Sequence, residues 1–242
     1  MKSFEYQDLL FAAILPGNKV STHSAPGDAV LIDLDLGILA VADGPERNPS
    51  ASACFLERFH ALAGASTSFD PDGRSLDTHF ESIVAETNDL LLATSYHENT
   101  TFSALIIGGD NRAVLLHTGD SLVYLISGTD RRVTQISRSN HFMVGRAPRL
   151  FQTEVLTVTG SDLVLLATDG LTDLARCHKL PVDRFLLHGL NGGGPRYLSD
   201  SIIARSGTVE VDLDDLSIIV ADPRSVRSGV SHPARRKKLL RY

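Results

Sequence analysis

The sequence predicts an α+β sandwich, in which mainly antiparallel strands form the sheets and helices cover their faces. Short apolar segments follow one another along most of the chain, and turn residues such as Gly108–Asn111 and Gly160–Asp162 separate them. Most neighbouring segments have no helix between them, which favours antiparallel meanders over parallel β-α-β units. Two long segments with helical periodicity supply the helices that cover the sheets.

The first predicted elements are a hairpin and a helix. Residues 29–34 and 38–42 are apolar and flank Asp35-Leu36-Gly37, which is a hairpin signal. Asn48 can cap the helix that follows, and Pro49 suits its first helical position. Its apolar side chains recur at helical spacing until Gly64 ends the pattern, at Phe55, Leu56, Phe59 and Leu62.

The second predicted helix covers about Leu76–Tyr96 and has one apolar face, formed by Leu76, Phe80, Ile83, Val84, Leu90 and Leu91. Further short segments are predicted to be strands: Thr101–Ile107, Ala113–His117, Leu122–Ile126, Arg132–Ile136, Thr153–Val158, Leu163–Ala167 and Leu216–Val220. There is no internal repeat and no low-complexity segment, so we expect one domain over residues 1–224.

Composition excludes several classes of protein. The 242 residues are enough for a sizeable core, and 43% hydrophobic with 21% charged residues excludes a disordered or fibrous chain. The net charge of −6 argues against a nucleic-acid partner. Two distant cysteines, Cys54 and Cys177, form neither a metal motif nor a disulfide framework. No apolar run is long enough to cross a bilayer, so we expect a cytoplasmic protein without a membrane partner.

The C-terminal residues 225–242 are predicted to be a basic tail. Five of the 23 lysine and arginine residues lie in the last eight positions, Arg235–Tyr242. Ser225–Pro233 reads as a loose linker in front of them. A solvated tail is the main interpretation, and contact with a weak anionic partner is the alternative.

An apolar strand that ends in Asp-Gly occurs twice in the chain. The copies are Leu39–Gly44 and Leu165–Gly170, and a third acidic cluster, Asp212, Asp214 and Asp215, precedes the last predicted strand. Strand ends can gather at one edge of a sandwich, where carboxylates repel each other unless a cation neutralises them. A glycine beside each aspartate lets a backbone carbonyl also serve as a ligand. Oxygen ligands select hard divalent ions, Mg²⁺ or Mn²⁺.

Four segments stand in a characteristic order along the chain: Ala40–Gly44, Thr118–Tyr124, Leu165–Asp173 and Asp214–Val220. Together they resemble the motifs of the metal-dependent protein phosphatases of the PPM, or type 2C, family. Thr100-Thr101 and Val133-Thr134-Gln135 agree with the same family. The resemblance covers roughly residues 28–221, which is most of the chain.

The resemblance implies a four-layer αββα sandwich with two Mn²⁺ or Mg²⁺ ions in a cleft at one end of the sheets. In the family pattern the carboxylate of Asp43 bridges both ions, the Gly44 carbonyl binds the second, and Asp169 and Asp214 bind the first. Asp120, together with Asp169, would hold a third and looser ion. Two such cations lower the pKa of a bridging water and neutralise phosphate oxygens during in-line attack. The implied substrate is a phosphoserine or phosphothreonine protein from kinase signalling, and we expect a monomer.

The chain departs from the family at the amino end. The family has Arg-x-x-Asn-Glu-Asp where this chain has His23–Asp28. Asp28 matches the final acid and is expected to support the metal ligands. His23 stands in place of the arginine that grips phosphate, and Gly27 replaces the glutamate. Phosphate binding should be weaker unless another arginine substitutes, and either His23 or a water could protonate the leaving group. The candidate arginines are Arg47, Arg146 and Arg149.

Two further assignments stay open within the sequence. Asp215 is an alternative to Asp214 as a ligand, but we prefer Asp214 because Asp215-Leu216-Ser217 then replaces the family's Asn-Ile-Thr in register. Scattered single histidines are typical of structural positions, and this applies to His117, His141 and His178.

Two alternative functions follow from the same residues. The missing arginine and glutamate are compatible with a catalytically weak or inactive phosphatase-like module that acts by binding a phosphoprotein or signalling partner. Retention of the acidic residues favours an active enzyme, because buried unpaired carboxylates destabilise a protein. Gly119–Leu122 also matches the nucleophile motif of a lipase and esterase family. That family needs Asp three residues before a histidine, and Gly229 precedes His232 here, so no triad can form.

Overall fold

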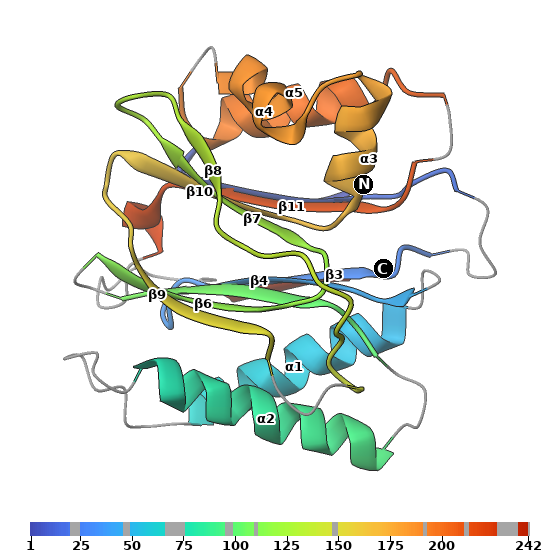
Figure 1. Cartoon of the computed structure of the whole chain (residues 1–242), viewed down its shortest axis with the longest axis vertical. Coiled ribbons are helices and arrows are strands. Elements are labelled where there is room, and N and C mark those ends of the chain that lie inside the picture. Colours follow the sequence, from blue (N-terminus) through green and yellow to red (C-terminus); the bar gives the residue numbers. More distant parts are fainter. Residues whose placement is uncertain are drawn as a thin grey trace.

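The fold is a four-layer αββα sandwich (Figure 1). The computed structural model describes residues 1–19, 25–45, 49–65, 76–94, 99–108, 111–146, 150–190, 193–210, 213–226 and 237–241. Helices α3, α4 and α5 cover one sheet, and helices α1 and α2 cover the other. The predicted fold class, with two antiparallel sheets flanked by helices, is confirmed.

Each sheet has six strands, and all the recorded strand pairs are antiparallel. The first sheet runs in the order β1 (Lys2–Tyr6), β2 (Leu10–Leu15), β11 (Leu216–Ala221), β10 (Asp162–Ala167), β7 (Leu122–Ser127) and β8 (Val133–Gln135). The second runs in the order β12 (Lys237–Arg241), β3 (Asp28–Asp33), β4 (Ile38–Asp43), β5 (Phe102–Ile107), β6 (Arg112–Thr118) and β9 (Gln152–Thr157). The strands predicted from apolar runs are all present, with ends that differ by about one residue.

The helices are α1 (Pro49–Ala65), α2 (Leu76–Thr94), α3 (Gly170–Cys177), α4 (Val182–Gly189) and α5 (Pro195–Ser206), with a 3₁₀ turn at Pro223–Ser225. The two long helices were predicted, although α1 continues one residue past Gly64. The expected cap Asn48 and the expected helix end at Tyr96 lie outside the described residues. None of the helices in the described ranges combines the length and the apolar character needed to span a bilayer.

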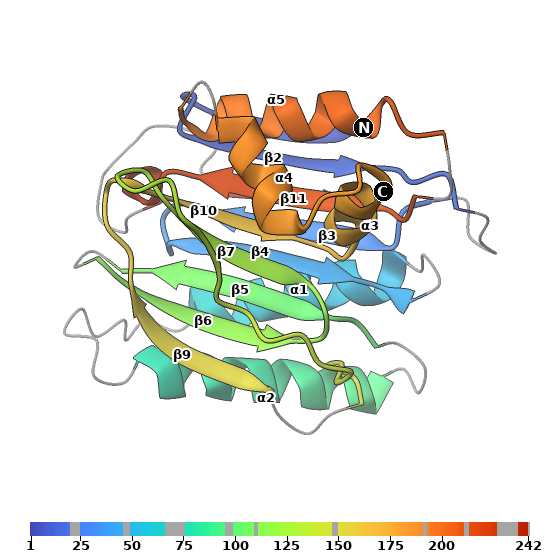
Figure 2. The same ribbon diagram turned by 45° about the horizontal axis from the view of Figure 1, so that its top comes forward.

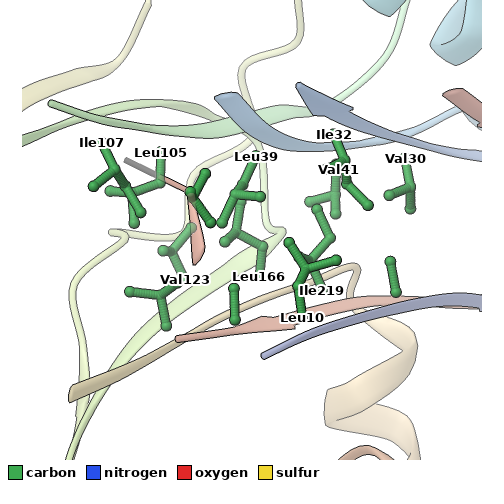
Figure 3. Close-up of a cluster of buried hydrophobic side chains, with 14 of the residues drawn as sticks. Leu10, Val30, Ile32, Leu39, Val41, Leu105, Ile107, Val123, Leu166 and Ile219 are labelled. Carbon is green, nitrogen blue, oxygen red and sulfur yellow. The ribbon is translucent and has the colours of Figure 1, made fainter. Parts of the chain in front are cut away.

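Three apolar clusters hold the layers together. The central cluster lies between the sheets, where Val30 and Val41 of the second sheet face Leu10 and Ile219 of the first (Figure 3). A second cluster joins the second sheet to α1 and α2, and a third joins the first sheet to α3, α4 and α5. Strands with a helix layer on one face and a sheet on the other are buried on both faces, which is why they read as continuous apolar runs.

The C-terminal segment differs from its prediction. Residues 237–241 form β12, which pairs antiparallel with β3, so this part is not a solvated tail. Leu240 is 4% exposed and belongs to the central cluster. Arg241 forms an ion pair with Glu57 of α1 at 2.6 Å. The strand was not recognised in the sequence because its basic residues are typical of a solvated tail. In an edge strand, charged side chains can stay in water while the alternate apolar side chains are buried.

Replacing Leu240 with Ala should lower the free energy of unfolding by about 2–4 kcal/mol, because it leaves a cavity in the central cluster. Leu92→Ala is the matched control: this leucine of α2 is 43% exposed, and its truncation should cost under about 0.5 kcal/mol. Urea denaturation of both variants measures the difference. Equal effects would contradict the packing of β12 against the core.

Candidate active site

The topology brings aspartates from both sheets to one end of the sandwich. Asp43 ends β4, and Asp28, its direct partner in the antiparallel register, begins β3. In the other sheet β10 ends just before Asp169, and β11 begins two residues after Asp214. Asp120 lies in the turn between β6 and β7. These strand ends lie at the end of the sheets where α3 starts (Figure 2).

The pKa values of these carboxyls report on their proximity. Burial, which is the largest cause, and the charges of Asp120, Asp214 and Asp28 together raise the pKa of Asp169 to about 7. Burial also raises the pKa of Asp43 well above its usual range, and the charges of Asp28, Asp169 and Asp120 add to the effect. For Asp28, burial is the main cause of a pKa raised to about 6. Without a cation, the ionised forms of these side chains destabilise each other.

Asp28 joins the two sheets through one hydrogen bond. The Thr168 hydroxyl, at the end of β10, donates to Asp28 Oδ2 at 2.8 Å. The same hydroxyl oxygen accepts a hydrogen bond from the Ser217 amide of β11 at 2.9 Å. The other oxygen, Asp28 Oδ1, is buried and accepts no hydrogen bond from the residues that the structure describes. A buried carboxylate oxygen without a donor is costly unless a cation or a water binds it.

Replacing Thr168 with Val should lower the free energy of unfolding by about 1–3 kcal/mol, because Asp28 and the Ser217 amide both lose a buried partner. Thr118→Val is the matched control, since the buried Thr118 hydroxyl has no partner among the described residues. That variant should be neutral or more stable. Chemical denaturation checks both; a Thr168→Val variant as stable as the control would contradict the role of this bond.

Two threonines hold the backbone of Asp43 and the turn that carries Asp120. The carbonyl of Asp43 accepts hydrogen bonds from the Thr100 hydroxyl at 2.7 Å and the Thr101 amide at 3.0 Å. The Asp43 amide donates to the Thr101 hydroxyl at 3.0 Å, and that hydroxyl lies 2.9 Å from the Ser121 hydroxyl. Gly119 has φ +106°, and a Cβ there would lie 2.6 Å from the Thr101 side chain. Glycine therefore lets the turn approach Asp43 closely.

Asp214 and Asp215 have different surroundings. Asp215 is 3% exposed, and its two oxygens accept hydrogen bonds from the amides of Gly17 at 2.8 Å and Gly27 at 3.1 Å. These bonds tie the amino-terminal loops to β11. Asp214 is more accessible, accepts a hydrogen bond from Lys19 Nζ at 2.7 Å, and contributes its charge to Asp169. Asp215 thus has a structural role, and Asp214 faces the acidic group.

The α3 helix can begin at this end only because its first residue is small. A Cβ at Gly170 would lie 2.1 Å from the Asp215 carbonyl oxygen. The glycine of each Asp-Gly pair is buried. The glycine after Asp169 therefore allows β11 and α3 to pack closely, which keeps Asp214 beside Asp169.

Solved structures provide the comparison for this arrangement. PstP, a serine/threonine protein phosphatase whose catalytic domain was solved with two manganese ions, is 21% identical, covers 88% of this chain and 98% of its own, and has a TM-score of 0.64. The PPM Ser-Thr phosphatase MsPP from Mycobacterium smegmatis, in complex with cacodylate, is 18% identical. The match covers 87% of this chain and 97% of MsPP, with a TM-score of 0.64. PppA of Pseudomonas aeruginosa, a key regulatory component of T6SS, is 19% identical. The match covers 91% of this chain and 99% of PppA, with a TM-score of 0.65. The chain has the PPM phosphatase fold.

The PPM fold is recognised here from three-dimensional similarity. No protein-family model matches the chain, and no curated protein matches it. At identities of 16–21% the similarity establishes the architecture, and the chemistry has to be argued from the residues at the strand ends.

Several residues singled out in the sequence lie elsewhere or outside the described part. His23, Arg47 and Arg149 are outside it. His117 is fully buried between the Ser103 hydroxyl at 2.7 Å and the Arg138 carbonyl at 3.0 Å, and burial lowers its pKa to about 4. It therefore has a structural role in the PPM fold.

Sequence reasoning missed Lys19 as part of this end of the PPM fold. The loop that carries it hydrogen-bonds to the segment just before β11, 195 residues away. No local pattern around Lys19 signals this contact. Only the pairing of β2 with β11 in the structure reveals it, because that pairing puts the end of β2 beside the start of β11.

The acidic end fits divalent cations by its chemistry. Among the described residues, no three His, Cys, Asp or Glu side chains are placed closely enough to hold an ion as they stand. However, the side chains offer only oxygen, as Mg²⁺ and Mn²⁺ prefer. Their mutual repulsion and the buried Asp28 Oδ1 without a donor are the features that a bound cation relieves.

Proposed function

We propose that this chain is a metal-dependent protein serine/threonine phosphatase, which hydrolyses phosphoserine and phosphothreonine monoesters. The observation that carries the proposal is the group of aspartates from five strand ends at one end of a PPM fold. Their raised pKa values indicate that the carboxyls sense each other's charge. A set of this kind is arranged for cations and, through them, for an anionic substrate.

In this proposal Asp43 would be a ligand of two ions, Asp169 and Asp214 would help to hold the first, and the carbonyl of Gly44 would help to hold the second. Asp120, which is exposed, is the proposed ligand of a third ion. Mn²⁺ and Mg²⁺ are the proposed metals. When bound, such ions activate a water and neutralise the oxygens of a phosphate group.

The protein's own residues prepare this site. Thr100 and Thr101 bind the backbone carbonyl of Asp43, which leaves its carboxylate as the group that faces the other aspartates. Thr168 holds Asp28 beside Asp43, so we propose that Asp28 acts through Asp43 as a positioning residue. His23 is the proposed donor of the proton that the leaving alcohol needs.

The test is hydrolysis of p-nitrophenyl phosphate and of a phosphothreonine peptide by the purified protein. Turnover is expected with Mn²⁺ or Mg²⁺ and should disappear with a chelator. Calorimetric titration of the same metals, in the same buffer, measures binding independently of turnover.

Metal binding without turnover on either substrate would contradict the proposed activity. It would instead indicate a phosphatase-like module that acts by binding a phosphoprotein. A turnover that persists in chelator would contradict the metal dependence, because every proposed ligand is an oxygen atom that acts here only through a cation.

A further inference from the structure

The acidic end already contains one cation, the ammonium group of Lys19. Its Nζ lies 2.7 Å from Asp214 Oδ2. The charges of Asp169 and Asp173 also act on it, after the stronger effect of the hydrogen bond to Asp214, and together they raise the pKa of Lys19. Lys19 is therefore ionised at neutral pH and partly neutralises the same carboxylates that are proposed to bind metal.

The backbone around Lys19 is fixed in place. The amides of Asn18 and Lys19 both donate to the Leu213 carbonyl at 3.0 Å. In return, the Leu213 amide donates to the Asn18 side-chain oxygen at 2.7 Å. These bonds place the loop directly beside Asp214, so the ion pair follows from the fold and does not depend on a chance encounter of two long side chains.

Close packing of the loop also depends on Gly17. A Cβ at this position would lie 2.3 Å from the Leu213 carbonyl oxygen. The Gly17 amide donates to Asp215 Oδ1 at 2.8 Å, which fixes the loop from its other side. The side chain of Lys19 itself is 52% exposed, so it can leave Asp214 for solvent while the backbone stays in place.

We propose that Lys19 is an internal counter-ion, which a divalent metal must displace from Asp214, and which thereby weakens metal binding at the acidic end. The proposal rests on the metal centre of the proposed function. A second observation points to a ligand at this end: Asp28 is 1% exposed, and its Oδ1 has no donor among the described residues. Lys19 neutralises Asp214 without reaching that oxygen in any recorded contact.

The exchange has a clear balance of charge. A metal that binds Asp214 releases the Lys19 ammonium to water and replaces one positive charge with two. An exposed ion pair of this kind is weak, so the metal can displace it, but the lost contact and the remaining repulsion both reduce the metal affinity.

The experiment is calorimetric titration of Mn²⁺ into the wild-type chain and into Lys19→Met. The variant should bind Mn²⁺ about threefold to tenfold more tightly, since it has no ion pair to break. Lys19→Arg keeps the charge and should bind as the wild type does. Lys238→Met, which removes an exposed lysine of β12, is the matched control and should also leave the affinity unchanged.

Thermal denaturation gives a second readout. Without metal, Lys19→Met should melt at a lower temperature than the wild type, because Asp214 loses its counter-ion. With Mn²⁺ its melting temperature should rise by more than that of the wild type.

Unchanged or weaker Mn²⁺ binding by Lys19→Met would overturn the proposal, and so would a failure of both proteins to bind Mn²⁺. A variant with unchanged metal affinity and a raised KM for phosphopeptide would assign Lys19 to substrate binding instead. A failure of the proposed phosphatase function gives a different result. In that case Lys19→Met still binds Mn²⁺ more tightly than the wild type, but neither protein hydrolyses phosphate esters.

Discussion

Replacing Asp43 with Asn is expected to abolish metal-dependent turnover and, at the same time, to raise the melting temperature of the metal-free protein. Asp43 is the proposed ligand of both ions, so turnover should fall at least about a thousandfold, on the order of 4 kcal/mol of transition-state stabilisation. Stability should change in the opposite direction. The ionised carboxylate lies among Asp28, Asp169 and Asp120. Burial is the largest cause of its raised pKa, and the charges of these three aspartates add to it.

The amide keeps the shape of the side chain and removes its charge. About 1 kcal/mol of relieved repulsion would raise the melting temperature by about 2–4 °C in a chain of this size. Phosphatase assays with Mn²⁺ and thermal denaturation in chelator measure the two effects.

Asp89→Asn is the matched control for Asp43→Asn. Asp89 is exposed on α2, and neither turnover nor melting temperature should change in this variant. An Asp43→Asn protein that keeps its turnover would contradict the metal site. One that is less stable than the wild type without metal would contradict the electrostatic description.

The stability of the metal-free protein is expected to fall as the pH rises from about 5 to about 8. Asp28 and Asp169 have raised pKa values, about 6 and about 7, whereas the ordinary pKa of an aspartate is 3.8. Over this interval the folded chain binds more protons than the unfolded chain, so deprotonation costs folding free energy. Each unit of pKa difference is worth about 1.4 kcal/mol. His117, whose pKa is lowered to about 4, has the opposite effect between pH 5 and about 6.5 and offsets part of the loss, so a net loss of about 2 kcal/mol is expected.

Urea denaturation in chelator at several pH values measures this dependence. Asp169→Asn should flatten it, because one of the two titrating groups is removed. Mn²⁺ should flatten it as well, since the cation takes the place of the protons. Asp33 does not contribute to the pH dependence in this interval. Burial alone would raise its pKa, but hydrogen bonds from His60 and from the amides of Leu36 and Asp35 lower it overall, so Asp33 titrates at lower pH. Stability that rises from pH 5 to 8 would contradict the crowding of these carboxyls.

The sequence was sufficient to predict most of the sheet strands and the two long helices. Buried strands such as β3, β5 and β11 are continuous apolar runs, and α1 and α2 are long enough for helical periodicity to be read. The Asp-Gly pairs also pointed correctly to strand ends at one edge, because antiparallel neighbours have fixed ends relative to one another.

The short helices and the strands β1, β2 and β12 were not predicted. Helices α3 and α4 have eight residues each, too few for a clear period, although Gly194-Pro195 is a start signal for α5 that could have been used. The apolar run of β2 was not assigned to a strand, and β1 is its largely exposed edge partner. β12 depends on a partner about 200 residues away, and local pattern carries no information about such pairing.

The same limit applies within the candidate site. Asp43, Asp169 and Asp214 stand at strand ends and could be identified one by one. The difference between Asp214 and Asp215 could not be settled from spacing, because it depends on which carboxylate accepts the amides of Gly17 and Gly27. The position of Lys19 depends on the same long-range contacts.

The hydrogen bond from Thr168 to Asp28 has a mechanical consequence for the sandwich. Its donor directly follows a strand of one sheet and its acceptor belongs to the other. The Gly27–Asp215 hydrogen bond links the sheets at the same end, and the apolar central cluster lies between them. Apolar contacts are non-directional, so they resist separation of the sheets more strongly than they resist sliding. A directional bond at one end opposes such sliding there. The alignment of the two sheets at this end is therefore coupled to the protonation and ligation of Asp28.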